Sequence, residues 1–169
     1  MRFLENFPLT LHSKMKARRI LMMLALMLSM AASAQNADQL YEEGKALYDA
    51  KDYAAAVTKL RPAAEKGHKK AQYRLARCYD KGHGVEENNA EAFKWYSKSA
   101  GQGYAKAEYQ VARAYLKGKG VEADEKKAKS YLKKAVSGKK HGQEIMDDIR
   151  EKAAEGDKTA SKMLTMLGK

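Results

Sequence analysis

Apolar residues recur every three or four positions along much of this chain, the spacing of helices that bury one face. In one segment, Ala71, Leu75, Cys78 and Tyr79 fall on a single helical face. The stretch 82–84 follows directly and reads Gly-His-Gly, whose glycines supply the backbone freedom that ends a helix in a tight turn. The pattern predicts a helix that stops at this turn.

A second helix is predicted immediately after the turn. Asn88 can cap its first turn, because an Asn side chain accepts a hydrogen bond from an otherwise free backbone N–H. Ala92, Trp95, Tyr96 and Ala100 then share one face, and glycines at 101 and 103 end the helix. The segment is therefore expected to form a pair of antiparallel helices.

The helix pair occurs twice. When the stretch 67–100 is laid over 103–136, a shift of 36 residues, fourteen of 34 positions are identical. Asp124 takes the capping place in the second copy, and Ala112 and Ala128 repeat the small residues Ala76 and Ala92 that let helices approach closely. A fixed period of this length is the signature of a repeat protein whose units stack on one another.

The repeated residues resemble a known family, the Sel-1-like repeats of the tetratricopeptide superfamily. The family's usual Gly is replaced by Ala76 and Ala112, the next smallest residue. The resemblance implies an all-α fold, a right-handed α-α superhelix with a concave groove lined mainly by the first helix of each pair. The matching residues of the first copy are Gly67, Ala71, Tyr73, Leu75, Tyr79, Gly82, Gly84, Val85, Ala92, Trp95, Tyr96 and Ala100.

The resemblance divides the chain into about three repeats and a cap. Residues 37–66 resemble an ordinary tetratricopeptide unit, and 67–102 and 103–138 are the two Sel-1-like repeats. Residues 139–169 form a degenerate half-repeat that we expect to be a pair of capping helices, because the last unit has no neighbour to cover its apolar face.

Residues 1–34 have the layout of a secretory signal peptide. A basic stretch at 15–19 precedes an apolar run at 20–30 and then Ala32-Ser33-Ala34, an A-x-A cleavage site. Met15 opens a more typical signal than Met1 and is a possible true start. We expect cleavage after Ala34 and export to the periplasm or the medium; an uncleaved membrane anchor is the alternative. No Cys stands at the cleavage point, so a lipoprotein anchor is not expected.

Charge narrows the choice of partner. The whole chain carries a net charge of +12, and without residues 1–34 it keeps 28 basic and 20 acidic residues, a net charge of +8. Three explanations of this positive charge are binding to nucleic acid, binding to an anionic envelope surface, and solubility alone. Export argues against nucleic acid, and the even spread of lysine favours a solvated surface. No membrane span is expected after cleavage.

Catalytic chemistry is not indicated. We find no phosphate loop, no paired-histidine zinc motif and no nucleophile elbow, and we expect neither a metal nor a cofactor. Cys78 could be a reactive thiol, and Trp95 could belong to an aromatic binding patch, but both fall on core faces. Some cysteine-rich Sel-1-like proteins have been linked to cell-wall compounds; their paired cysteines are missing here.

A ladder of aromatic and basic residues on the first helices carries the functional hypothesis. Two residues four positions apart share a helical face, and an aromatic ring beside a cation would suit an acidic peptide or another carboxylate. The tyrosines could equally well only pack in the core. The candidate partner-binding residues are Tyr41, Lys45, Tyr48, Lys70, Tyr73, Arg77, Lys106, Tyr109, Arg113 and Lys117.

We therefore predict an exported protein–protein interaction scaffold rather than an enzyme. It would bind a partner protein or peptide in its groove. Two alternatives remain: a cell-wall-associated binding protein or enzyme, and a structural module of a larger envelope complex. A pocket with convergent polar groups would favour the first of these.

Overall fold

A computed structural model describes residues 19–23, 36–138 and 141–168. The chain divides into two compact units, residues 1–36 and 37–169. In the first unit the structure describes a short helical stretch at 19–23, with Ile20 to Met23 exposed to solvent, and Asn36 at its end. The predicted cleavage site and the alternative start at Met15 lie outside the described residues. None of the described helices combines the length and the apolar character needed to cross a bilayer.

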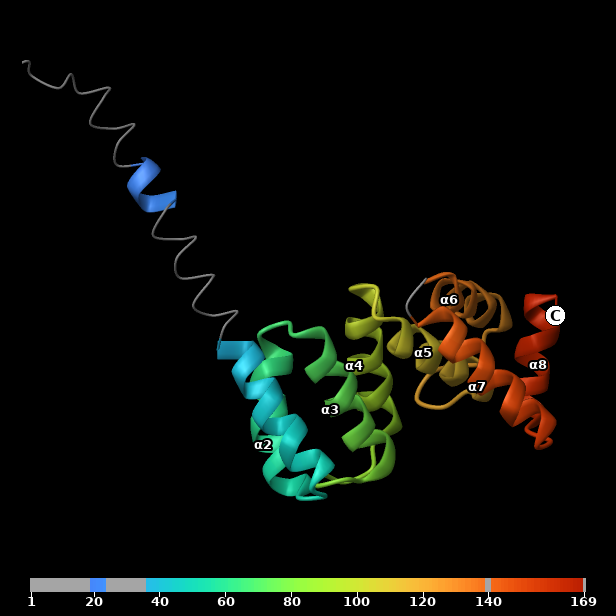
Figure 1. The fold of residues 1–169 in the computed structure, drawn as a ribbon, viewed down its shortest axis with the longest axis horizontal. Helices are drawn as coiled ribbons and strands as arrows, with labels where there is room; N and C mark the ends of the chain where they lie inside the picture. The colour runs from blue at the N-terminus through green and yellow to red at the C-terminus, as the bar shows by residue number, and fades with distance from the viewer. Residues whose placement is uncertain (1–18, 24–35, 139–140, 169) are drawn as a thin grey trace, which may run out of the picture. The chain divides into compact units, whose positions relative to one another are not determined.

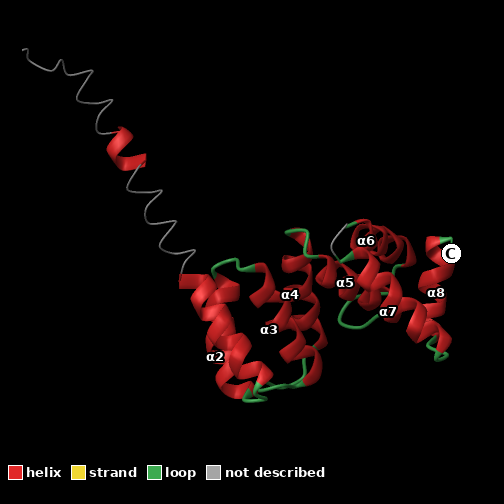
Figure 2. Ribbon diagram, viewed as in Figure 1, coloured by secondary structure: helices red, strands yellow, loops and turns green. Residues whose placement is uncertain are grey.

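The second unit is a succession of helices of similar length joined by short turns (Figure 1). Figure 2 shows helices and loops only, and no strand occurs in the described residues. A first helix spans 36–49. It is followed by α2 (Tyr53–Glu65), α3 (Lys69–Lys81), α4 (Asn89–Gly101), α5 (Ala105–Lys117), α6 (Glu125–Ser137), α7 (Gly142–Ala154) and α8 (Lys158–Leu167).

The predicted helix ends are confirmed. Asn88 accepts a hydrogen bond from the Glu91 N–H at the start of α4, and Asp124 accepts one from the Lys127 N–H at the start of α6. Gly82 and Gly118 adopt the left-handed conformation directly after α3 and α5. The two repeats therefore share both their sequence and their local geometry.

The second glycine of each Gly-x-Gly turn joins neighbouring units. Gly84 lies against the Tyr53 carbonyl at the start of α2, and Gly120 lies against the Asn89 carbonyl at the start of α4. A Cβ atom at either glycine would clash with that carbonyl, and both residues have positive φ. Each turn is thus fixed on the second helix of the preceding unit, which sets how the units stack.

The core is continuous from one unit to the next. One cluster of buried side chains runs from the helix at 36–49 to α5, and a second runs from α5 to α8. The helix α5 contributes to both clusters, since Val111 belongs to the first cluster and Ala112 to the second. This confirms the expectation that each helix pair covers the apolar face of its neighbour.

The small and apolar residues predicted for the core are buried. Ala76, Ala112 and Ala128 have no exposed surface, and helices pack closely over them. Cys78 is also completely buried, and this burial raises the pKa of its thiol to about 11. Trp95 is 6% exposed, as expected of a core residue.

The C-terminal segment forms the expected helix pair. Ile145 and Ile149 of α7 and Met163 of α8 are buried, and they belong to the second cluster of buried side chains. Asp157 caps α8 by accepting hydrogen bonds from the backbone N–H groups of Thr159 and Ala160.

Candidate binding pocket between α3 and α5

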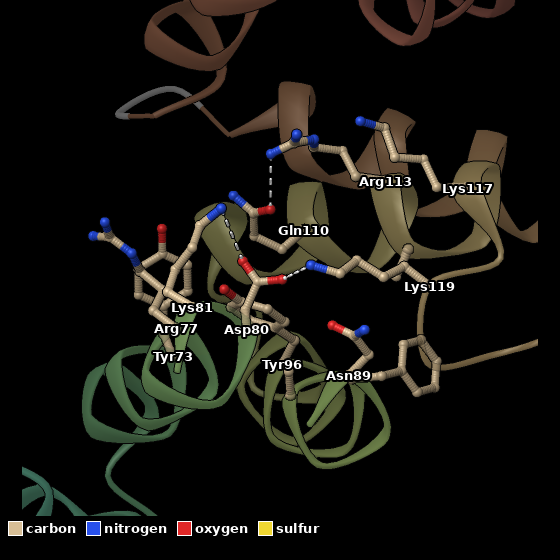
Figure 3. Close-up of a pocket in the computed structure, with 13 residues that line it drawn as sticks. Tyr73, Arg77, Asp80, Lys81, Asn89, Tyr96, Gln110, Arg113, Lys117 and Lys119 are labelled. Carbon is tan, nitrogen blue, oxygen red and sulfur yellow. Dashed lines mark hydrogen bonds and ion pairs between the residues drawn. The ribbon is translucent and has the colours of Figure 1, made fainter. Parts of the chain in front are cut away.

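A pocket of about 440 Å³ lies between α3 and α5, with the beginning of α4 as its floor. Figure 3 shows the side chains that line it, which come from these elements and from the turn that follows α5; those of Lys81 and Lys119 point toward Asp80. It is lined by Tyr73, Arg77, Asp80, Lys81, Asn89, Ala92, Phe93, Tyr96, Gln110, Arg113, Ala114, Lys117 and Lys119.

The pocket lining is strongly basic. It contains five lysine and arginine side chains and one carboxylate, that of Asp80. The Asp80 carboxylate accepts a hydrogen bond of 2.7 Å from the Lys119 ammonium and lies 3.7 Å from the Lys81 ammonium (Figure 3). Two of the five cations are therefore already paired with Asp80.

The other three cations are Arg77, Arg113 and Lys117, and none of them forms an ion pair with a carboxylate of the described residues. The Arg77 guanidinium lies 5.5 Å from the centre of the Tyr48 ring, and the Arg113 guanidinium lies 5.8 Å from that of Tyr109. Such stacking holds a guanidinium in place while leaving its N–H groups available for an anion.

Arg113 donates to a neutral amide, and Arg113 and Lys117 act on the Asp157 carboxylate without forming an ion pair with it. Arg113 donates a hydrogen bond of 3.2 Å to the side-chain oxygen of Gln110, which is a neutral acceptor. Arg113 and Lys117 help to lower the pKa of Asp157, but backbone N–H groups have the larger effect, and it is to these that the carboxylate binds as a helix cap.

The floor of the pocket contains two uncharged polar groups, the Asn89 side-chain amide and the Tyr96 phenol. The Asn89 side-chain oxygen is buried and has no hydrogen-bond partner within the described structure. It is therefore an unsatisfied hydrogen-bond acceptor. Tyr96 is 4% exposed, and burial, with a smaller effect of Asp80, raises the pKa of its phenol. The phenol therefore keeps its proton at neutral pH.

Four of the ten candidate residues named from the sequence meet at this pocket: Tyr73, Arg77, Arg113 and Lys117. The rings of Tyr41, Tyr48 and Tyr109 are buried in the core. The remaining candidates lie elsewhere. Lys45 pairs with Asp49 at 3.4 Å, Lys106 pairs with Glu144 at 2.7 Å, and exposed Lys70 lies 5.9 Å from the centre of the Tyr41 ring.

The sequence analysis missed several pocket residues, chiefly Asp80, Lys81, Asn89, Gln110 and Lys119. Lys119 is the central residue of the second Gly-x-Gly turn, and only the docking of that turn on the start of α4 carries it to Asp80. The sequence feature that could have indicated Lys119 is the repeated Gly-x-Gly turn, because a turn that recurs in each unit is expected to contact the neighbouring unit.

The next cleft, between α5 and α7, is smaller and closed by ion pairs. Its volume is about 170 Å³. The Lys106 ammonium donates to Glu144 at 2.7 Å, and the Tyr109 hydroxyl donates to Asp148 at 3.1 Å. Asp148 also accepts hydrogen bonds from Lys152. Carboxylates of α7 thus occupy this cleft.

Among the described residues no group of three or more His, Cys, Asp and Glu side chains has the geometry of a metal site. The pocket combines cations, a carboxylate, amides and phenols without a nucleophile paired to a base. An anion that also carries hydrogen-bond donors would be complementary to these groups.

The fold and the pocket define an α-helical solenoid of tandem helix pairs with a basic cleft between neighbouring first helices. The Sel1 repeat family model matches residues 69–104 and 105–139. Residues 69–139 accordingly contain two Sel1 repeats, as the repeated residues suggested, and Sel1-like repeats belong to the tetratricopeptide-like superfamily. Repeats of this kind mediate protein–protein interactions.

Solved structures support the same conclusion. A Sel1 repeat protein from Oxalobacter formigenes is 28% identical, with a TM-score of 0.57 over 82% of this chain and 96% of that one. A protective antigen of uropathogenic Escherichia coli strains, described as displaying an SLR fold, is 29% identical, with a TM-score of 0.61 over 75% of this chain and 28% of the antigen.

One curated relative is similar over part of its length. A Rhizobium meliloti (strain 1021) protein described as an exopolysaccharide production negative regulator is 44% identical over 61 residues. That stretch covers 36% of this chain and 23% of the regulator, so the match is confined to a fraction of the larger protein.

Proposed function

We propose that this protein is an exported interaction scaffold that binds an acidic segment of a partner protein in the pocket between α3 and α5. The observation that carries the proposal is the meeting of Arg77, Arg113 and Lys117 at one pocket without a carboxylate partner among the described residues. Arginine binds a carboxylate through two parallel hydrogen bonds, so such a pocket is complementary to Asp or Glu side chains.

Export is proposed from the leader. A basic stretch, a short apolar run and Ala32-Ser33-Ala34 form the order of elements that signal peptidase requires. The exported form would work in the periplasm or in the medium, where a net charge of +8 favours encounter with acidic partners.

A pocket with polar groups is the feature expected of the cell-wall-associated alternative, but the polar groups here are mainly cations without a nucleophile paired to a base, which suits the binding of a partner's carboxylates better. The cysteine-rich alternative depends on cysteines, and Cys78 is completely buried with a pKa of about 11, which keeps the thiol protonated and unreactive at neutral pH. A permanent structural module is the other alternative. It predicts an interface that does not depend on Arg77 and Arg113.

The test is the binding of a fluorescein-labelled hexaglutamate peptide to the purified protein, measured by fluorescence anisotropy at low salt. We expect Arg77→Gln combined with Arg113→Gln to weaken binding by at least tenfold, since each lost charge-assisted hydrogen bond is worth about 1.5–3 kcal/mol. Glutamine keeps much of the side chain that packs on Tyr48 and Tyr109, so the melting temperature should change little.

A matched control removes the same charge elsewhere. Lys59 pairs with Glu43 and Arg150 pairs with Asp147, and neither Lys59 nor Arg150 lines the pocket. Lys59→Gln combined with Arg150→Gln should leave hexaglutamate binding within twofold of the unaltered protein. If the two double variants lost the same affinity for hexaglutamate, the loss would follow from the lower net charge of the protein. Binding at the pocket would then be contradicted.

A further inference from the structure

One face of α6 consists of exposed lysines. The helix carries five lysines and one glutamate, so its net charge is +4, half of the net charge of +8 expected for the exported form. Lys126, Lys129 and Lys133 follow one another at spacings of three and four, which places them on one face. All three are exposed, whereas Ala128 and Leu132 on the opposite side are completely buried. These three residues are called the α6 lysine face below.

No carboxylate of the described residues forms an ion pair with the α6 lysine face. The neighbouring charges of the helix are paired with one another or with α8: Lys127 lies 3.2 Å from Asp124, and Glu125 pairs with Lys162. Like charges three or four residues apart on a helix repel one another. An anionic surface that approached this face would relieve the repulsion.

The charge of α3 is equally high but is used differently. Its net charge is also +4, with five cations and one carboxylate. Arg74 pairs with Asp49 at 3.2 Å, and Lys81 lies 3.7 Å from Asp80. A third cation, Arg77, lines the pocket. Much of the charge of α3 is therefore taken up by contacts within the protein, and that of the α6 lysine face is not.

The α6 lysine face does not belong to the repeat pattern. One repeat earlier, in α4, the equivalent positions hold Ala90, Phe93 and Ser97. The buried positions do agree between the two helices, as Ala128 and Ala92 show. The packing of the repeat therefore does not require lysine at the three exposed positions, and their replacement should leave the fold intact.

We propose that the α6 lysine face binds the surface of a bilayer that contains anionic phospholipids. Lysine presents a compact, hydrated charge that suits a diffuse layer of phosphate headgroups, whereas arginine suits the bidentate contacts of a defined site. A protein hot spot or stacked nucleic-acid bases would favour arginine or exposed aromatic rings. α6 contains no arginine, and its aromatic residue, Tyr131, is partly buried with the Lys134 ammonium 5.3 Å from the ring centre. The contact is electrostatic and peripheral, since the face has no apolar side chain to insert.

The test is the co-sedimentation of the purified full-length protein with large lipid vesicles at low salt. One set of vesicles is phosphatidylcholine alone, and the other is an equal mixture of phosphatidylcholine and phosphatidylglycerol. The test variant combines Lys126→Gln, Lys129→Gln and Lys133→Gln. Glutamine has nearly the helix propensity of lysine, so helicity and melting temperature should not change.

A matched control removes three positive charges from other helices. Lys45, Lys59 and Lys94 are exposed lysines that pair with carboxylates, and none of them lies on α6. The control variant combines Lys45→Gln, Lys59→Gln and Lys94→Gln. It has the same net charge as the test variant but keeps the α6 lysine face.

We expect the unaltered protein to bind the mixed vesicles, to ignore the neutral ones, and to dissociate at high salt. The test variant should bind the mixed vesicles at least tenfold more weakly, because each lysine near an anionic surface contributes about fivefold. The control variant should stay within twofold. Hexaglutamate binding by the test variant should also stay within twofold, since none of the three lysines lines the pocket.

Four outcomes would overturn the proposal. Equal vesicle binding by all three proteins would place the attraction elsewhere in the chain, such as in the basic leader. Equal losses in the two variants would reflect net charge alone. Displacement of the protein from vesicles by soluble glycerol 3-phosphate would indicate a site for single headgroups, and a tenfold loss of hexaglutamate binding in the test variant would assign the face to an acidic protein partner.

Discussion

Glu108 in α5 occupies the position that Gln72 occupies one repeat earlier in α3. The Gln72 amide donates to the Ala64 carbonyl at 3.0 Å and accepts from the Gln102 amide at 2.8 Å. Glu108 is 8% exposed; burial raises the pKa of its carboxyl, and Lys134 opposes this to a smaller extent. An ionised carboxylate cannot donate to the Ala100 carbonyl, the equivalent of that of Ala64.

Glu108→Gln is therefore expected to stabilise the protein by about 1 kcal/mol at pH 7, the net value of one buried hydrogen bond. A raised carboxyl pKa favours the folded state below the unfolded pKa, and this stability is lost as the pH rises through the folded pKa. The advantage of glutamine should accordingly shrink toward pH 4. Urea unfolding of both proteins at pH 4, 5.5 and 7 measures this; a constant difference would rule out ionisation as its cause.

Gly120→Ala should destabilise the protein strongly. The residue has φ of +74°, and an added Cβ would clash with the Asn89 carbonyl, which is held at the start of α4. Left-handed strain costs about 1–2 kcal/mol, and forced displacement of the packed turn adds a similar amount. The total of about 3 kcal/mol would appear as a lower urea midpoint.

Gly103→Ala separates the two contributions. Gly103 has φ of +70°, but nothing lies within 4 Å of the position of its Cβ. We expect it to show the backbone strain alone, about 1 kcal/mol. If the two alanine variants lost the same stability, the close approach of Gly120 to α4 would contribute nothing to the stacking of the units.

His68 makes the N-terminal units sensitive to acid. Its Nδ1 accepts the Ala71 N–H at 3.0 Å as the cap of α3, its Nε2 lies 3.2 Å from an Asp38 oxygen, and its ring stacks on Tyr41. Burial lowers the pKa of His68 most, Lys70 lowers it further, and Asp38 and Glu42 raise it. Protonation of Nδ1 would remove the cap.

A lowered histidine pKa gives stability that is present above the unfolded pKa of about 6.5 and lost as the pH falls through the folded pKa. His68→Asn keeps a capping oxygen and removes the titration, so the loss of about 1 kcal/mol between pH 7.5 and 5 should largely disappear. His141→Asn, at a residue that does not cap α7 through its side chain, is the control and should keep the loss. Thermal melts at the two pH values decide between these outcomes.

Most of the fold was predictable because it depends on local chemistry. The caps at Asn88, Asp124 and the glycines at 82 and 118 depend only on neighbouring residues in the sequence. The period of 36 residues identifies the successive units. The binding pocket was only partly predictable. Spacing put Arg77 and Arg113 on equivalent faces, but it could not show that Arg77 stacks on Tyr48 of the preceding unit or that Tyr109 turns its hydroxyl to Asp148 of the next. Those contacts are set by the rotation between units, which the period does not specify.

Asp80 should oppose the binding of acidic ligands. It provides the sole carboxylate among the pocket-lining residues, and it holds the ammonium groups of Lys119 and Lys81. Asp80→Asn would remove one negative charge and release the Lys81 ammonium, while the Lys119 ammonium would keep the Glu87 carboxylate 3.9 Å away. Because these groups are partly exposed and screened by salt, we expect a modest gain, about threefold tighter binding of hexaglutamate at low ionic strength.

The gain should fade between 20 mM and 300 mM salt, since the Debye length shortens over this range. Asp147→Asn removes one negative charge from a residue outside the pocket and serves as the matched control. If Asp80→Asn weakened binding instead, the Asp80–Lys119 pair would be what holds the turn at 118–120 in the binding conformation, because the loss of that pair would then outweigh the removal of a repulsive charge.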